Sequence, residues 1–236
     1  MTSKGKRIDT VLFDLGQTLV GYYTREQFPE ILDEAIGEVA LYLRRHSLLK
    51  VSLESAWAAA PSENYESKDP AVRPLLGRLC RIFHLDESEI TPEVDLELSR
   101  RFLRPTFRIA HLYEDSLPVL GRLRSEGYRT AIVSNTPWGT PASLWREELD
   151  RWRLSDAVDM SVFCMDAGVR KPGREIFEYT LDKLGTSAKR CLFVGDNPKW
   201  DIAGPQAIGM EAFLIQRESP EESSRNLYQL LDYLGL

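Results

Sequence analysis

Hydrophobic residues in this chain follow two different spacings. Residues 8–15, IDTVLFDL, are a run of β-branched and apolar residues without helical spacing, which predicts a buried strand. In residues 25–46, apolar residues instead recur every three or four positions, which predicts an amphipathic helix. The apolar face of this helix comprises Phe28, Ile31, Leu32, Ala35, Ile36, Val39 and Leu43. The pattern therefore predicts a strand followed by a change to helical structure.

The helical pattern extends from about residue 24 to residue 104. A polar loop is expected at residues 61–70, and further helices are expected at residues 71–85 and 92–104. We expect residues 21–108 to form a helical domain, inserted after the first strand of a core built from residues 1–20 and 109–236.

After residue 111 the predicted strands and helices alternate. Strands are expected at residues 128–135, 158–164, 189–196 and 210–216. Helices are expected at residues 115–127, 141–152, 173–185 and 199–209, and an amphipathic helix is expected after a polar connection at residues 218–226. This alternation predicts an α/β fold, with a doubly wound parallel sheet covered by helices on both faces.

Composition narrows the classes of protein that need to be considered. The 236 residues are 43% hydrophobic and 28% charged, and the formal net charge is −6, which disfavours broad nucleic-acid binding. No apolar run is long enough to cross a membrane, and the basic N-terminal segment lacks a signal-like apolar stretch. Three unpaired cysteines argue against a disulfide framework or zinc site and favour a cytoplasmic location. We expect a monomer or a homodimer.

Polar side chains stand at the ends of three predicted strands. Asp14 and Thr18 follow the first, Ser134 and Asn135 end the second, and Asp196 ends a third. In an open parallel sheet, ligands bind beyond the carboxyl ends of the strands. We therefore expect these side chains to meet at one rim, with the helical domain above it.

The residue types at this rim suggest phosphoryl chemistry. Asp14 and Asp196 would repel each other unless a cation lay between them, and carboxylate oxygens favour Mg²⁺. Lys171 and the Ser134 hydroxyl would bind phosphate oxygens, and a carboxylate aimed at phosphorus can act as a nucleophile. Each residue alone also has an ordinary explanation: a turn-forming carboxylate, a helix cap or a surface lysine.

Four motifs in order resemble the haloacid dehalogenase-like (HAD) superfamily. These are FDLGQTL, IVSNT, Lys171 in VRKPGREIF, and VGDNPKWD, and the resemblance spans about residues 8–216. The helical region resembles the C1 cap of that family, which closes over small substrates. The resemblance implies a Rossmann-like core and a Mg²⁺-dependent phosphohydrolase that acts on a small phosphorylated molecule through an aspartyl phosphate.

Residue roles follow from the same resemblance. It implies that Asp14 is the nucleophile, that Thr18 and Ser134 orient the phosphoryl group, and that Lys171 offsets charge around the nucleophile. Ser134, Asn135 and Lys171 are the expected substrate-binding residues. The expected metal site comprises Asp14, the Gly16 carbonyl, Asp196 and Asp201.

Gly16 departs from the family pattern, because related phosphatases usually have an aspartate there that protonates the leaving group. General acid–base catalysis typically contributes a factor of about 10²–10⁴ in rate. Three explanations are open: an activated phosphate as substrate, an acid supplied by another residue, or weak or absent phosphatase activity. The candidate replacement residues are Tyr22, Tyr23, Glu26, His84 and His111.

Two other functions remain as alternatives. A 2-haloacid dehalogenase would also use Asp14 as nucleophile, although Asp196 argues against it, because such enzymes lack an acid there. A protein that binds a phosphorylated ligand without turnover would explain Gly16. Trp138 either lines the substrate pocket or packs as an ordinary core aromatic residue.

Overall fold

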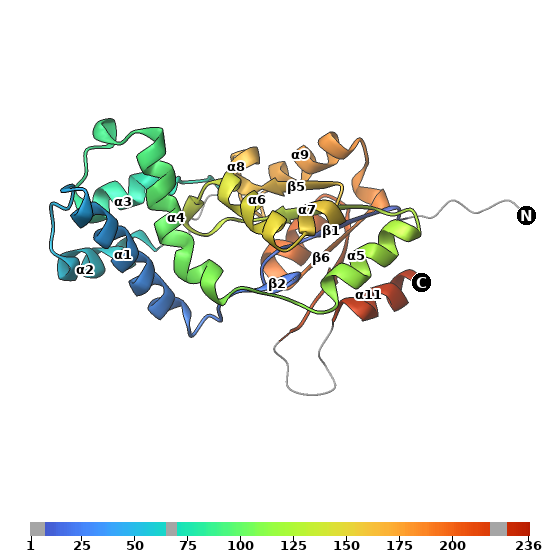
Figure 1. Cartoon of the computed structure of the whole chain (residues 1–236). Helices are drawn as coiled ribbons and strands as arrows, with labels where there is room; N and C mark the ends of the chain where they lie inside the picture. The colour runs from blue at the N-terminus through green and yellow to red at the C-terminus, as the bar shows by residue number, and fades with distance from the viewer. Residues whose placement is uncertain (1–7, 65–69, 218–225) are drawn as a thin grey trace, which may run out of the picture.

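The computed structural model describes residues 8–64, 70–217 and 226–236. Figure 1 shows an α/β core that contains the main sheet, and a block of helices, coloured blue to green, beside it. The C-terminus lies at the end of the core that is remote from this block of helices. None of the described helices is both long and apolar enough to span a membrane.

The described residues form a main sheet of five parallel strands, which confirms the predicted α/β fold. The strand order is β5 (Met160–Phe163), β4 (Arg129–Ser134), β1 (Thr10–Phe13), β6 (Cys191–Gly195) and β7 (Glu211–Leu214). In the central register, Phe13 lies opposite Ile132 on β4 and Val194 on β6. The first strand is therefore central, which explains why every residue of β1 is apolar or buried.

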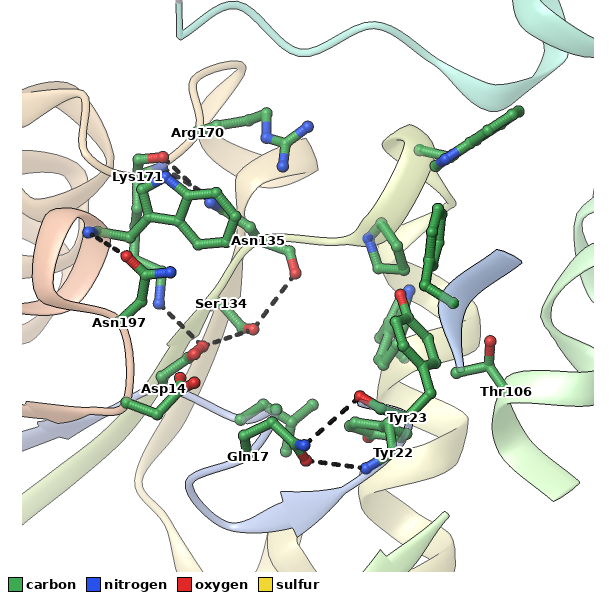
Figure 2. Close-up of a pocket in the computed structure, with 18 of the residues that line it drawn as sticks. Asp14, Gln17, Tyr22, Tyr23, Thr106, Ser134, Asn135, Arg170, Lys171 and Asn197 are labelled. Atoms are coloured by element: carbon green, nitrogen blue, oxygen red, sulfur yellow. Dashed lines mark hydrogen bonds and ion pairs between the residues drawn. The ribbon is translucent and has the colours of Figure 1, made fainter. Parts of the chain in front are cut away.

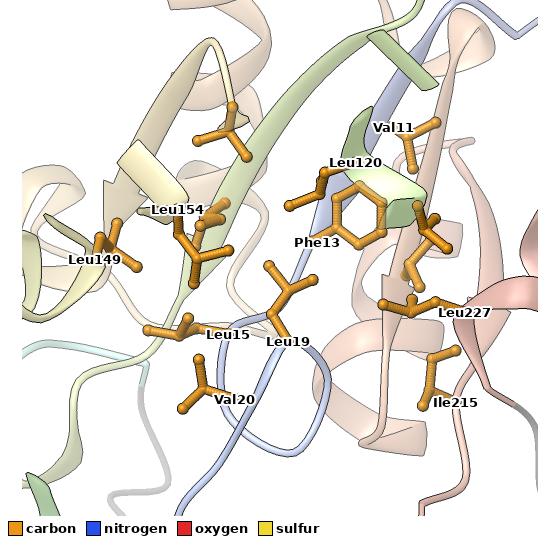
Figure 3. Close-up of a cluster of buried hydrophobic side chains, with 14 of the residues drawn as sticks. Val11, Phe13, Leu15, Leu19, Val20, Leu120, Leu149, Leu154, Ile215 and Leu227 are labelled. Atoms are coloured by element: carbon orange, nitrogen blue, oxygen red, sulfur yellow. The ribbon is translucent and has the colours of Figure 1, made fainter. Parts of the chain in front are cut away.

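Successive residues of β1 point to opposite faces of the sheet and enter two separate cores. On one face, Val11 and Phe13 pack with Leu120 and Leu227 (Figure 3). The helices whose residues join this core are α5 (Ser116–Ser125), α6 (Ala142–Arg151), α7 (Leu154–Ala157) and α11 (Leu227–Leu234).

On the opposite face, Leu12 packs with Phe177 and Phe193. This side carries α8 (Cys164–Ala167) and α9 (Arg174–Leu184), while a π-helix, η4 (Pro198–Ala203), leads into α10 (Gly204–Ala207). Helices thus cover both faces of the sheet, and its polar side chains are left at the ends of the strands.

The helical block consists of α1 (Phe28–Arg45), α2 (Leu53–Glu63), α3 (Leu75–Phe83) and α4 (Pro92–Ile109). It has a hydrophobic cluster of its own, to which α1 contributes the face expected from the sequence, including Ile36, Val39 and Leu43. Burial of the periodic apolar residues explains why these four segments pack as one unit.

Two expected helix boundaries were wrong. The loop expected from residue 61 begins later, because α2 includes Pro61 in its last turn. Burial of Ala56 and Ala60 outweighs the hydrogen bond that the proline cannot donate. Likewise, α4 continues through Pro105 because Phe102 and Thr106 extend its buried face. Residues 65–69 of the expected loop, 218–225 of the polar connection and 1–7 of the basic N-terminal segment lie outside the described residues.

A short antiparallel pair joins the two connections between the core and the helices. β2 (Val20–Gly21) pairs with β3 (His111–Leu112). Farther away, Ala71 forms an isolated bridge with Val169, and the Arg170 amide donates to the Pro70 carbonyl. The helical block is therefore attached next to the rim of the sheet, as well as at its own two ends.

Candidate active site

The carboxyl ends of β1, β4 and β6 bring together side chains from distant parts of the chain. Asp14 directly follows β1, Ser134 ends β4, and Asp196 directly follows β6. The Ser134 hydroxyl donates a hydrogen bond of 2.8 Å to Oδ1 of Asp14 (Figure 2). Because these strands are adjacent and parallel, the expected rim is present in the structure.

Lys171 lies buried beside Asp14, with its side chain only 1% exposed. Its ammonium nitrogen Nζ is 2.8 Å from Oδ1 of Asp14 and 2.7 Å from Oδ1 of Asp201. Burial alone would lower the pKa of Lys171, but the charges of Asp14 and Asp201 raise it above its ordinary value. The lysine is therefore a charged group shared by two carboxylates rather than a surface residue.

Asn135 fixes the backbone of Lys171. The Asn135 Oδ1 accepts from the Lys171 amide at 2.8 Å, and its Nδ2 donates to the Lys171 carbonyl at 3.1 Å. This two-point contact connects the end of β4 to the loop before α9. Asn135 thus positions the lysine, while its side chain also lines the adjoining cavity.

Asp14, Asp196 and Asp201 form an acidic cluster, with one carboxylate oxygen of each lying within 4.8 Å of the others. Burial, together with the charges of Asp14 and Asp201, raises the pKa of Asp196 to about 7. Burial and Asp14 raise the pKa of Asp201 to about 6, although Lys171 opposes the shift. One ammonium therefore faces three carboxylates, and this excess of oxygen donors suits a hard divalent cation.

The π-helix η4 places Asp201 in this cluster. Asn197 caps the element by accepting from the amides of Lys199 and Trp200, and the Asn197 amide donates to Asp201 Oδ2 at 3.0 Å. Local hydrogen bonding thus orients the Asp201 carboxylate toward Lys171. The spacing of the fourth motif is explained by this turn.

Gly16 and Thr18, the other site residues predicted from the first motif, differ in whether they line the cavity. Gly16 lines the cavity, and a Cβ atom added there would meet the ring of Tyr22 at 3.6 Å, an ordinary contact. The backbone conformation therefore does not require glycine. Thr18 is fully buried and outside the cavity lining, and its hydroxyl has no hydrogen-bond partner within the described ranges.

A cavity of about 540 Å³ opens beside the acidic cluster, between the core and the helical block. From the core it is lined by Asp14, Ser134, Lys171 and Asp196, among others. Residues 21–108 contribute Tyr22, Tyr23, Arg25, Phe28, Asn64, Arg78 and Thr106 to its lining. A chamber of this size accommodates a small organic ligand.

Sequence reasoning missed three cationic residues of the cavity, Arg25, Arg78 and Arg170. Arg78 lies on the buried face of α3, between Leu75 and Leu79, so an arginine at an apolar-face position was the available signal. Arg170 directly precedes Lys171 in the sequence, which was a weaker signal.

Of the residues considered as replacement acids, Tyr22 and Tyr23 line the cavity, whereas Glu26, His84 and His111 are outside its described lining. Burial raises the pKa of Tyr22 well above its ordinary value and that of Tyr23 to about 12. The Tyr22 hydroxyl is fully buried and has no hydrogen-bond partner among the described residues. Both phenols are therefore neutral, and the Tyr22 hydroxyl is shielded from the cavity.

Trp138 belongs to the core by sequence and to the helical block by packing. It follows β4 with a positive φ of 54°, and its ring lies 5.2 Å from that of Phe102 on α4. Its Nε1 donates to Oδ1 of Asn64 at 3.1 Å. The next residue, Gly139, also has a positive φ, and a Cβ there would lie 2.0 Å from the Arg73 carbonyl oxygen. Trp138 is thus both a packed aromatic residue and part of the cavity wall.

Comparison with known sequences shows one family over most of the chain. The sequence pattern of haloacid dehalogenase-like hydrolases matches residues 8–209. Phosphoserine phosphatase from Thermus thermophilus is 27% identical over 219 residues, which cover 90% of this chain and 85% of that protein. (S)-2-haloacid dehalogenase 1 from a Pseudomonas species is 32% identical over 113 residues, which cover 48% of each protein.

Solved structures show the same fold. A HAD phosphatase from Thermococcus onnurineus has a TM-score of 0.64 and 25% identity, and the match covers 97% of this chain and 98% of that one. A 2-haloacid dehalogenase from Pseudomonas syringae has a TM-score of 0.68 and 22% identity, with the same coverage.

Proposed function

The chain belongs to the haloacid dehalogenase-like hydrolases, and we propose that it is a Mg²⁺-dependent phosphohydrolase acting on a small phosphorylated molecule. One observation carries this proposal: the Asp14 carboxylate stands at the cavity between the Ser134 hydroxyl and the buried Lys171 ammonium, within the acidic cluster. This arrangement supplies a nucleophile, two phosphate-binding groups and oxygen ligands for a metal.

The donor set fits Mg²⁺ in type and charge. Asp14, Asp196 and the Gly16 carbonyl are the proposed ligands, while Asp201 acts mainly through its ion pair with Lys171. Burial, together with the charges of Asp14 and Asp201, raises the pKa of Asp196, and a bound cation would relieve the repulsion among these carboxylates. When bound, Mg²⁺ would neutralise charge on the phosphoryl oxygens and so let a carboxylate approach phosphorus.

The proposed reaction has two displacement steps. A carboxylate oxygen of Asp14 attacks phosphorus, the bond from phosphorus to the leaving oxygen breaks, and an aspartyl phosphate forms. Ser134 and Lys171 hold the phosphoryl oxygens through their O–H and N–H donors. Water then attacks the aspartyl phosphate, inorganic phosphate leaves, and the Asp14 carboxylate is restored.

Gly16 sets the proposed preference among substrates. Glycine has no side chain to protonate a leaving oxygen, and the neighbouring Tyr22 hydroxyl is buried. An acyl phosphate or a phosphoanhydride leaves without that proton, whereas an alkyl alcohol needs it. We therefore propose that activated phosphates are hydrolysed faster than alkyl phosphates.

The helical block, residues 21–108, is proposed to act as a C1-type cap. Its residues Phe28, Asn64, Arg78 and Thr106 close the side of the cavity that faces the acidic cluster. Under this assignment, the helical block selects the substrate and the core carries out the phosphoryl transfer.

A screen of purified protein with acetyl phosphate, p-nitrophenyl phosphate and glycerol 3-phosphate tests the function, with and without MgCl₂. We expect Mg²⁺-dependent phosphate release, fastest from acetyl phosphate. Asp14→Asn should abolish release, whereas Asp182→Asn, an exposed carboxylate on α9, should leave it unchanged. Phosphate-analogue binding without release from any of the three compounds would instead support a non-catalytic ligand-binding protein.

The dehalogenase alternative is favoured by one observation, the lack of an acid at Gly16 in a chain that also has (S)-2-haloacid dehalogenases among its relatives. Asp196 in the acidic cluster counts against it. Chloride release from (S)-2-chloropropionate in the presence of a metal chelator would establish dehalogenation. If, in addition, no phosphate ester is hydrolysed, the phosphatase proposal is refuted.

A further inference from the structure

Three guanidinium groups line the cavity in addition to Lys171: those of Arg78 and Arg170, and that of Arg25, which is exposed. Arg78 comes from α3 of the helical block, and Arg170 comes from the loop before α9. We propose that the substrate carries a second anionic group, a carboxylate or a second phosphate, and that Arg78 and Arg170 bind it. This inference deepens the proposed function and rests on it, because it assumes that the phosphoryl group lies at Asp14.

Arg78 is buried at the cavity wall, with 4% exposure. Its guanidinium lies 5.3 Å from the Trp138 ring centroid and donates to the Glu63 carbonyl oxygen. A guanidinium has five N–H donors, so it can keep this carbonyl and still bind a ligand oxygen. Contact with the Trp138 ring also limits its movement, which reduces the entropy lost on binding.

The carboxylate near Arg78 is already compensated by another arginine. Both oxygens of Glu63 accept from Arg81, at 2.8 Å and 2.7 Å, and the Arg81 hydrogen bond is the main reason that the pKa of Glu63 is lowered. Glu63 therefore balances Arg81. A buried positive charge at a cavity wall is stabilised by an anionic ligand.

Arg170 provides a second cation closer to the core. It is half-buried, and its guanidinium forms no hydrogen bond or ion pair with the part of the chain that the structure describes. Figure 2 shows its side chain above Asn135, directed away from Lys171 and toward the open space beside the helical block. Burial raises the pKa of Tyr23, and the charge of Arg170 opposes that rise, which indicates that the two side chains lie near each other.

The charged residues of the cavity fall into two groups with different proposed roles. The acidic cluster with Lys171 occupies the end formed by the sheet, where a metal and a phosphoryl group would bind. Arg78 and Arg170 line other parts of the wall, and a volume of about 540 Å³ leaves room for more than a phosphoryl group. Arginine pairs with carboxylate and phosphate through parallel N–H donors, so either anion satisfies this site.

Matched ligand pairs test the proposal. Inhibition of p-nitrophenyl phosphate hydrolysis is measured for 3-phosphoglycerate against glycerol 3-phosphate, and for glucose 1,6-bisphosphate against glucose 6-phosphate. The first pair isolates a carboxylate and the second a phosphate. We expect the doubly anionic member of at least one pair to bind tenfold or more tightly, since a charged hydrogen bond typically contributes about tenfold to a hundredfold in affinity.

Substitutions of Arg78 and Arg170 test which residue is responsible for the preference for doubly anionic ligands. Arg78→Gln and Arg170→Gln should each reduce it about tenfold, with little effect on the singly anionic ligands. Loss in only one variant assigns the anion to that arginine. Arg174→Gln, at an exposed arginine paired with Glu178, is the control and should retain the preference. If Arg78→Gln does not fold, Arg78→Lys keeps the charge without the guanidinium geometry and should lower the preference partially.

Calorimetric titration of the same ligands into the wild-type protein with MgCl₂ separates this proposal from the proposed function. Preferential binding of a doubly anionic ligand, without phosphate release from acetyl phosphate, p-nitrophenyl phosphate or glycerol 3-phosphate, would refute the phosphatase proposal and keep the anion site. Equal affinities within both pairs, or a preference unchanged in both arginine variants, would refute the anion site while leaving phosphatase activity intact.

Discussion

Replacement of Gly16 by aspartate tests whether a missing proton donor limits this enzyme. The structure has room for the side chain, because a Cβ atom at residue 16 would lie 3.6 Å and 3.9 Å from two ring carbons of Tyr22 and the backbone is not left-handed. Nearby Asp14 and Asp196 would raise the pKa of the new carboxyl group. That shift keeps part of it protonated, as a proton donor must be.

The expected gain depends on the leaving group. General acid catalysis contributes a factor of about 10²–10⁴, equivalent to about 3–5 kcal/mol of activation free energy. We expect Gly16→Asp to raise kcat/KM for glycerol 3-phosphate by about 10²-fold, the lower end, because the carboxyl group must share space with the Tyr22 ring. Hydrolysis of acetyl phosphate should change by about twofold or less, since its leaving group needs no proton.

Phosphate release at saturating Mg²⁺ measures both substrates, and Gly16→Asn provides the control with the same shape but no acidic proton. A rise for glycerol 3-phosphate in the aspartate variant alone supports the reasoning. The reasoning is refuted if the folded aspartate variant retains acetyl phosphate hydrolysis without any gain for the alkyl ester, or if asparagine produces the same gain.

Three further predictions concern stability and are measured by urea unfolding, followed by tryptophan fluorescence. Lys171→Met should lower the free energy of unfolding by about 3–5 kcal/mol near neutral pH, because it leaves buried carboxylates unpaired; a loss below about 1 kcal/mol would contradict this. In metal-free protein, the pKa of Asp196 is about 7 in the folded state, against an ordinary value of 3.8. Between these values the folded state binds more protons than the unfolded state. The free energy of unfolding should therefore fall as pH rises from about 4 to about 7. Asp196→Asn should flatten that slope and MgCl₂ should oppose it, whereas a slope unchanged by both would exclude this origin. Gly139→Ala should destabilise the protein by at least about 2 kcal/mol through its positive φ and backbone clash, while Gly121→Ala, in an open helical position of α5, should be neutral or stabilising; equal effects would show that the turn at Gly139 is not constrained.

Local patterns were sufficient to predict the core because its strands are short and buried on both faces. Val11, Leu12 and Phe13 are apolar in succession, so that both faces of the strand are apolar there, which predicts a buried strand. The strand ends then predict a common rim without any knowledge of loop structure, and Asp14 and Ser134 are in hydrogen-bond contact there. The paired strands β2 and β3 were missed because two residues carry no periodicity.

Residues that reach the cavity from the helical block could not be assigned from sequence. Arg78 lies within the inserted helical block, and the direction of its side chain depends on how α3 packs against α4 and Trp138. Similarly, Thr18 belongs to the first motif, yet it is fully buried and lies outside the cavity lining. Side-chain direction at such positions is decided by tertiary packing, which spacing along one chain does not encode.

The position of Trp138 makes the two halves of the molecule mechanically dependent on each other. Only three residues separate it from Ser134, while its ring is embedded among side chains of the opposite half. Moving that ring out of its contacts would expose roughly 150–250 Å² of indole surface to water, at a free-energy cost on the order of 4–6 kcal/mol. A movement of the helical block that carried this ring with it would therefore also displace the nearby end of β4, on which Ser134 lies.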